Sequence, residues 1–85
     1  MAKTFNLSIV TPDKMLAEKK CVSLIVPSEL GYMGILANHA PLVANLAKGK
    51  ITLKDASGKP EEFFSAGRGF IEVLNNEVVI ILRSN

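Results

Sequence analysis

The chain has 85 residues, 48% of them apolar, and its ten basic and eight acidic residues give a formal net charge of +2. This length fits one small domain, and the apolar content is too high for a disordered chain. The basic residues are scattered and not interleaved with aromatic residues, which argues against a nucleic-acid-binding protein, and no apolar stretch reaches the roughly 18 residues of a membrane span.

Alternating apolar and polar residues predict the first elements. Residues 5–9 alternate in the way typical of a strand with one buried face. A proline-containing turn at residues 11–13 should end this strand. Residues 12–20 could form one helical turn. Residues 22–26 alternate again, and we expect this second strand to stop at Pro27.

The only cysteine, Cys21, has the opposite parity to the apolar residues of the second predicted strand. No residue suited to metal or nucleophilic chemistry lies near it in sequence, so we expect a small packing residue. A single cysteine excludes an intrachain disulfide and favours a reducing compartment. Because the N-terminal residues also lack the apolar core of a signal peptide, the sequence predicts a soluble, cytoplasmic protein.

The second half of the chain continues as short strands. Residues 50–54 alternate as a half-exposed strand, and residues 55–62 have the composition of a hairpin loop. Strands are predicted over residues 63–67, 69–74 and 77–83, and two asparagines join the last two. The last strand lacks polar alternation, which predicts that both its faces are covered or that its outer face meets another protein. The elements predict an all-β sandwich or barrel, as one domain over residues 1–85.

No combination of residues in the sequence is suited to catalysis. His39 is the only imidazole and Cys21 the only thiol, so one chain cannot assemble a multi-histidine or cysteine–histidine zinc site. There is no Gly-x-Ser-x-Gly motif. The AGRGF stretch at residues 66–70 lacks the lysine and the following helix of a phosphate-binding loop. We therefore expect no catalytic residue, no metal ligand and no cofactor-binding residue.

The segment GYMGILANHAP, residues 31–41, combines glycines with large apolar side chains. Gly31 and Gly34 allow backbone angles that other residues avoid. Tyr32 and Met33 lie between them, and tyrosine and methionine exposed together are typical of the centre of a protein interface. The segment therefore predicts a surface for a partner rather than an active site.

Four blocks of sequence, in order, resemble a known family. They are G-x-x-G-I-L-x-x-H-A-P-L, L-A-K-G-K-I, A-G-R-G-F-I-E-V and N-E-V-V-I-I-L, and they are similar to the epsilon subunit of F-type ATP synthases. The opening FNLSIVTPDK is similar to the first strand and turn of that family, so the resemblance covers the whole chain. It corresponds to the N-terminal β-sandwich domain. The C-terminal helical hairpin of longer members has no counterpart within these 85 residues, which is expected of a naturally short member or an excised domain.

The resemblance implies a flattened β-sandwich of about ten short strands and a non-catalytic role in the rotor. In that role the protein contacts the gamma subunit and the polar loops of the membrane c-ring, and couples proton flow to ATP synthesis. It is then a peripheral protein on the cytoplasmic side of the bacterial inner membrane, with membrane contact only through the complex and no cofactor or nucleic acid. The candidate partner interface consists of Gly31, Tyr32, Met33, Gly34, Asn38 and His39.

Within this interface we expect Tyr32, Met33 and His39 to project toward the partners, and Ile35 and Leu36 to anchor the loop. The sequence departs from the family where Tyr32 and Met33 replace the usual Glu-Leu, so that Glu29 could supply the acidic contact to the c-ring. The alternative interpretation is a free-standing β-sandwich that binds a ligand or peptide through residues 31–41.

Overall fold

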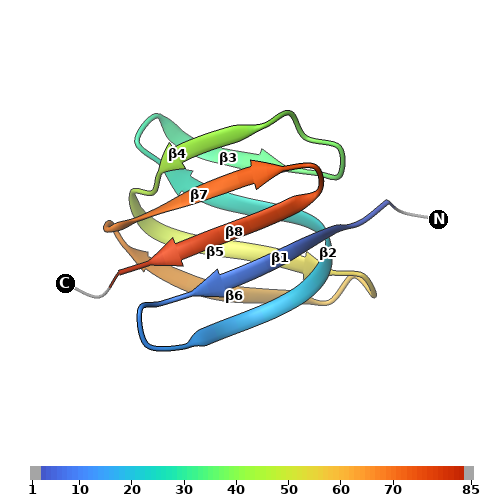
Figure 1. Ribbon diagram of the computed structural model, residues 1–85, viewed down its shortest axis with the longest axis horizontal. Coiled ribbons are helices and arrows are strands. Elements are labelled where there is room, and N and C mark those ends of the chain that lie inside the picture. Colours follow the sequence, from blue (N-terminus) through green and yellow to red (C-terminus); the bar gives the residue numbers. More distant parts are fainter. Residues whose placement is uncertain (1–2, 84–85) are drawn as a thin grey trace.

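The computed structural model describes residues 3–83. These residues form eight β-strands and no helix (Figure 1), and so no helix among them could cross a membrane. The strands are β1 (Phe5–Val10), β2 (Met15–Ser28), β3 (Gly31–Ile35), β4 (Leu42–Asn45), β5 (Lys48–Asp55), β6 (Pro60–Ala66), β7 (Gly69–Leu74) and β8 (Glu77–Leu82). The predicted all-β class is confirmed.

The strands form one sheet that folds over on itself into two layers. The pairing order is β4-β7-β8-β1-β2-β5-β6, with β3 also paired to β2. Figure 1 shows β4, β7, β8 and β1 in the front layer and β3, β5 and β6 behind them, with β2 curving from one layer into the other. Neighbouring strands are antiparallel except β1 and β8, which run parallel.

The long strand β2 corrects three expectations from the sequence. Its first half is not helical, because residues 15–20 pair with β1 from Val10 to Asn6, with Leu16 as an unpaired bulge residue. It does not stop at Pro27 but continues to Ser28; the Pro27 carbonyl still accepts a hydrogen bond from the Ala47 N–H at 2.9 Å. Because β2 bends instead of breaking, eight strands rather than about ten account for the described residues.

A bulge in β2 reverses the alternation that the sequence suggested. Cys21 pairs with Asp55 and Ser23 with Lys54, so Val22 is one extra residue on the β2 side. The bulge brings Cys21 onto the same inward face as Leu24, and both are fully buried, whereas Val22 is only half-buried. Cys21 is thus a small packing residue, as expected, but for a reason that strict period-two counting misses.

A single aliphatic core lies between the two layers. It is built from inward-facing residues of every strand except β4 and β6 together with the bridge residue Leu46. The buried apolar residues are Phe5, Leu7, Ile9, Ala17, Cys21, Leu24, Val26, Ile35, Leu46, Ile51, Leu53, Ile71, Val73, Val78, Ile80 and Leu82. The partly buried Met33, Leu42, Ala44 and Phe63 pack against this core.

Candidate partner interface

Four of the six predicted interface residues lie on β3, an edge strand that pairs only with β2. Its alternation separates two roles. Ile35 is buried and Met33 is half-buried against the core, so these two side chains face inward. Tyr32 and Gly34 belong to the opposite, outer face. The expected anchoring by Ile35 is confirmed. The expectation that Met33 projects away from the sandwich is wrong, because its side chain packs against the core and is only partly exposed.

Tyr32 does not project freely from the outer face. Although 62% exposed, its hydroxyl accepts a hydrogen bond of 3.2 Å from the Lys50 N–H on β5. A Cβ atom added at Gly49 would lie 2.7 Å from that hydroxyl and 3.0 Å from Pro27 Cβ. The side chain therefore crosses β2 and its hydroxyl rests over Gly49, while most of the residue stays exposed.

Asn38 and His39 follow the C-terminal end of β3 and lie beside the turn between β7 and β8. Asn38 has φ 65°, and its N–H donates to Asn76 Oδ1 at 2.6 Å, while Asn76 Nδ2 donates to Asn38 Oδ1 at 3.1 Å. His39 Nδ1 lies 2.7 Å from the Ala40 carbonyl oxygen. With Pro41 and Asn75, these residues line a shallow cavity of about 320 Å³.

The predicted interface thus divides into two places, the face around Tyr32 and the turn around His39. Leu36 lies between them and is 63% exposed. The expectation that Leu36 helps to anchor the loop is wrong, because Leu36 directly follows the buried Ile35 at the end of β3 and is itself exposed. Its side chain adds apolar area to the surface instead.

An apolar groove that the sequence did not predict lies between the edge strands β3 and β4. This edge groove has a volume of about 430 Å³ and is lined mainly by residues of the β2–β3 turn and of β4. Leu30 at the tip of the turn is 100% exposed, and Val43 on β4 is 68% exposed. Met33 contributes the floor from β3. The alternation of Leu42 to Asn45 could have suggested an outward Val43, but nothing in sequence places it beside Leu30.

A second apolar surface crosses the front layer and explains the continuous apolar run of β8. Ile81 pairs with Phe70 on β7 and with Val10 on β1, and Val10 pairs with Met15 on β2. These four partly exposed side chains, Phe70, Ile81, Val10 and Met15, form one row that we call the front band. None of the described residues covers the band. The sequence predicted that β8 either has both faces covered or has an outer face that meets another protein. Within residues 3–83 the outer face of β8 is not covered, so the first alternative does not hold there.

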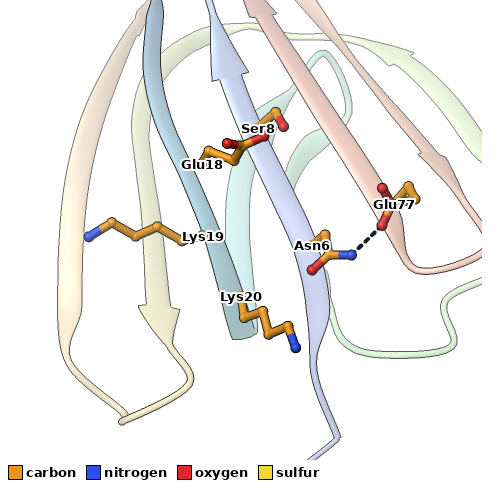
Figure 2. Close-up of a pocket in the computed structure, with 6 residues that line it drawn as sticks. All are labelled: Asn6, Ser8, Glu18, Lys19, Lys20 and Glu77. Carbon is orange, nitrogen blue, oxygen red and sulfur yellow. Dashed lines mark hydrogen bonds between the residues drawn. The ribbon is translucent and has the colours of Figure 1, made fainter.

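Polar groups gather further along the same front layer. Figure 2 shows Asn6, Ser8, Glu18, Lys20 and Glu77 around an open cavity of about 320 Å³, with Asn6 Nδ2 donating to Glu77 Oε2 at 2.5 Å. Lys19 points away from it in Figure 2 and forms an ion pair with Glu61 on β6. Residues 3–83 contain no group of three His, Cys, Asp or Glu side chains placed to hold a metal ion. The cavity is an open, polar surface over β1, β2 and β8.

Two titratable groups are perturbed, and both shifts have structural causes. Burial, and secondarily the charge of Asp55, raises the pKa of the Cys21 thiol, which keeps it protonated and unreactive. Hydrogen bonds from the Ser57 hydroxyl and the Lys59 N–H lower the pKa of Asp55. Asp55 lies at the β5–β6 turn, so neither group belongs to an arrangement suited to proton transfer.

Comparison with known proteins agrees with this architecture. The family model of the ATP synthase delta/epsilon chain β-sandwich domain matches residues 4–84. The ATP synthase epsilon chain of Dichelobacter nodosus is 38% identical over 81 residues, covering 95% of this chain and 56% of that protein. The epsilon chain of Leptospira borgpetersenii is 41% identical over 80 residues, covering 94% of this chain and 61% of that protein. The chain therefore spans little more than half the length of these relatives.

Solved structures match the fold over nearly the whole chain. A chain in the Euglena gracilis mitochondrial ATP synthase, in a structure that includes the c-ring, has a TM-score of 0.86 at 25% identity and covers 93% of this chain and 50% of that one. A chain in the central stalk and c-ring structure of the Tetrahymena thermophila enzyme has a TM-score of 0.75 at 18% identity, covering 98% and 66%. By its sequence match over residues 4–84 and its two-layered β fold, the chain belongs to the ATP synthase delta/epsilon chain family and spans the β-sandwich domain of that family.

Proposed function

We propose that this chain is a non-catalytic rotor subunit of a bacterial F-type ATP synthase, which joins the gamma subunit to the c-ring. The observation that carries the proposal is the family match over residues 4–84, which includes every strand of the fold. The complex would hold the chain as a peripheral protein on the cytoplasmic side of the membrane. Its contribution is mechanical, because proton-driven rotation is transmitted only if the connecting subunit does not deform.

The two-layered architecture is suited to that role. Strand β2 belongs to both layers, so a torque applied to either layer reaches the other through a continuous backbone. The core between the layers is closely packed and aliphatic, and such interiors have low compressibility. A rigid connector of this kind resists twisting better than two domains joined by a flexible linker.

The distribution of apolar surface supports a chain held between two partners. The edge groove is lined by the β2–β3 turn, β3 and β4, whereas the front band crosses β7, β8, β1 and the start of β2. Large exposed side chains such as Leu30 and Val43 are typical of interface centres when they cluster. We assign the edge groove and the neighbouring Tyr32 face to partner contact, together with the turn at Asn38 and His39.

Reconstitution tests the assignment. The chain is added to bacterial ATP synthase stripped of its epsilon subunit, and its affinity is measured for gamma alone, for the c-ring alone and for the two joined. We expect strongest binding to the joined rotor and restored coupling of ATP synthesis to proton flow. A chain that binds none of the three and restores no coupling would contradict the proposal and favour a free-standing binding module.

Two double variants locate the contact. Leu30→Ser with Val43→Ser should weaken binding to the rotor by about tenfold or more, because burying each apolar side chain contributes roughly 1.5–3 kcal/mol before the ordering cost. Tyr32→Ala with Met33→Ala should also weaken binding, but with some loss of thermal stability, since Met33 packs on the core. The control is Leu16→Ser, an exposed apolar side chain on β2 that belongs neither to the edge groove nor to the front band. If both groove residues can be replaced without effect on affinity, the edge groove is not an interface.

A further inference from the structure

The positive charge of this chain is concentrated at one end of the sandwich. Arg68 on the β6–β7 turn, Arg83 just after β8 and Lys48 at the start of β5 are all exposed there. Arg68 and Arg83 line one open cavity of about 370 Å³, and the backbone of Lys48 lies beside Gly67. We call these three residues the basic end. In Figure 1 it lies at the left, where the C-terminus is marked.

The rest of the chain is electrically balanced. The sequence has ten Lys and Arg residues and eight Asp and Glu residues. Only one carboxylate, Glu29, lines the cavity at the basic end. When these three cations and Glu29 are set aside, seven basic and seven acidic side chains remain. The whole side-chain excess of +2 therefore resides at this one end.

The basic residues at this end are available for a partner and are held in place. Two ion pairs form among residues 3–83, Lys19–Glu61 and Lys50–Glu62, and neither involves the basic end. The Arg83 N–H donates to the Arg68 carbonyl at 2.7 Å, and the Leu46 N–H donates to the Gly69 carbonyl at 2.9 Å. These bonds fix the backbone on both sides of the cavity from which the two arginine side chains extend.

We propose that the basic end binds an acidic protein segment, with Asp or Glu carboxylates seated between Arg68 and Arg83. Arginine presents a planar fork of donors that matches a carboxylate in a bidentate arrangement. Gly67 and Gly69 line the cavity beside the two arginines, and neither carries a charge that would compete with them for a carboxylate. The proposal concerns the chemistry of the contact and holds whichever subunit or protein supplies the acidic segment.

Other anionic partners fit less well. Recognition of anionic lipid typically uses clusters of about four to eight basic residues, and this end has three with a carboxylate among them. Nucleic-acid binding needs a longer basic surface for the many phosphate contacts that supply its affinity. A second copy of this chain placed end to end would bring like charges together, which disfavours a symmetric pair.

A titration followed by NMR tests the proposal on the full chain. The probe is a ten-residue synthetic peptide of alternating Asp and Gly, and the control peptide has Asn in place of Asp. We expect the Asp peptide to shift amide signals of residues 67–70, 46–48 and 83, and high salt to abolish the shifts because exposed charges are screened. Equal shifts with the Asn peptide, or Asp-peptide shifts spread over lysines throughout the chain, would overturn the proposal.

A matched pair of variants completes the test. Arg68→Gln with Arg83→Gln should weaken binding of the Asp peptide by about tenfold, the amount that two exposed ion pairs supply. Lys54→Gln with Lys59→Gln removes the same charge at the opposite end of β5. This variant should change the affinity for the Asp peptide less than twofold, because distant exposed charges are screened. Equal losses in both variants would mean that only net charge matters and would overturn the proposal.

Vesicles distinguish a lipid from a protein source of negative charge. Sedimentation with vesicles of phosphatidylcholine, alone or mixed with phosphatidylserine, is measured for the wild-type chain and for both double variants. No specific vesicle binding is expected. Binding to the phosphatidylserine vesicles that depends on Arg68 and Arg83, in a chain that ignores the Asp peptide, would overturn the proposal in favour of a membrane contact. Because no rotor component is present, these results are independent of the assembly test above.

Discussion

At the scale of single residues, a reciprocal pair of asparagine amides connects the loop after β3 to the turn between β7 and β8. Asn38 and Asn76 exchange two hydrogen bonds, and both have positive φ. Asn38→Gly and Asn76→Gly keep these backbone angles accessible and remove only the amides. The backbone N–H of Asn38 can still donate to Asn76 in Asn38→Gly, so a double-mutant cycle reports the bond between the two side chains. We expect its unfolding free energies to give a coupling of about 0.5–1 kcal/mol.

Asn75 provides the control for this cycle. It lies in the same turn with φ 50°, and no side-chain hydrogen bond is recorded for it among the described residues. Asn75→Gly should therefore show no coupling to Asn38→Gly in urea-unfolding measurements. A coupling as large as that of Asn76 would mean that the glycine substitutions perturb the turn itself, and the amide pair would then carry no stabilisation.

The Asp55 carboxylate predicts a specific dependence of stability on pH. Its Oδ1 accepts hydrogen bonds from the Ser57 N–H, the Ser57 hydroxyl and the Lys59 N–H, and these donors lower the pKa of Asp55 from its ordinary 3.8. A carboxylate with a lowered folded-state pKa stabilises the fold above its unfolded pKa, and this stabilisation is lost as the pH falls through the folded-state value.

The measurement compares wild type with Asp55→Asn, which keeps an acceptor oxygen but cannot ionise. We expect wild type to be more stable at neutral pH and the difference in unfolding free energy to shrink as the pH falls below the ordinary 3.8. If the difference is the same at neutral and acidic pH, the carboxylate charge has no role in holding the turn.

At the scale of elements, the pairing of β7 with β8 depends on a glycine that allows a close approach. A Cβ atom at Gly69 would overlap the carbonyl oxygen of Ile81. Gly69→Ala should therefore lower the free energy of unfolding by about 2–3 kcal/mol, since overpacking against backbone has little room to relax. Thermal and urea unfolding of the variant measure this loss.

Gly34 on β3 is the matched control. A Cβ atom there would meet nothing within 4 Å, so Gly34→Ala should change the free energy of unfolding by no more than about 0.5 kcal/mol. Similar losses in both variants would show that glycine flexibility in the strands, and not the contact with Ile81, sets the effect.

The same scale explains which parts of the fold could be predicted from sequence. Strands with regular alternation, such as β1 and β5, were predicted because each buries one face. The course of β2 was not predicted. Its bulge at Val22 arises because Cys21 and Ser23 pair with β5, which is distant in sequence. Residues 15–20 were ambiguous because the local sequence is compatible with one helical turn, whereas pairing with β1 makes these residues part of a strand.

The candidate interface was predictable only in part, for a similar reason. Exposure of Tyr32 followed from its place between glycines in an apolar segment. The groove between Leu30 and Val43 required knowing that β3 and β4 are both edge strands whose lining residues meet. The basic end likewise unites Arg68, Arg83 and Lys48, which are far apart in sequence. The alternation of apolar and polar residues indicates which face of a strand a residue lies on. Which residues of other strands lie beside it depends on how the strands pair.

At the scale of the whole molecule, the two layers should unfold as one cooperative unit. Strand β2 pairs with β1 in front and with β3 and β5 behind, so neither layer can open without exposing part of β2. The single core is shared, with Ile80 of β8 and Ile51 of β5 both fully buried. A rotor connector would need this coupling, because a layer that opened alone would yield under torque.

Ile80→Val and Ile51→Val test the coupling from opposite layers. Each removes one buried methylene group and should lower the free energy of unfolding by about 0.5–1.5 kcal/mol. If unfolding is two-state, either substitution speeds hydrogen exchange of the most protected amides in β5 and in β8 by the same factor, about fivefold for 1 kcal/mol. If each variant speeds exchange only in its own layer, the layers are separate cooperative units. The bend of β2 would then be a flexible joint, and rigid transmission through this domain would have to come from its partners.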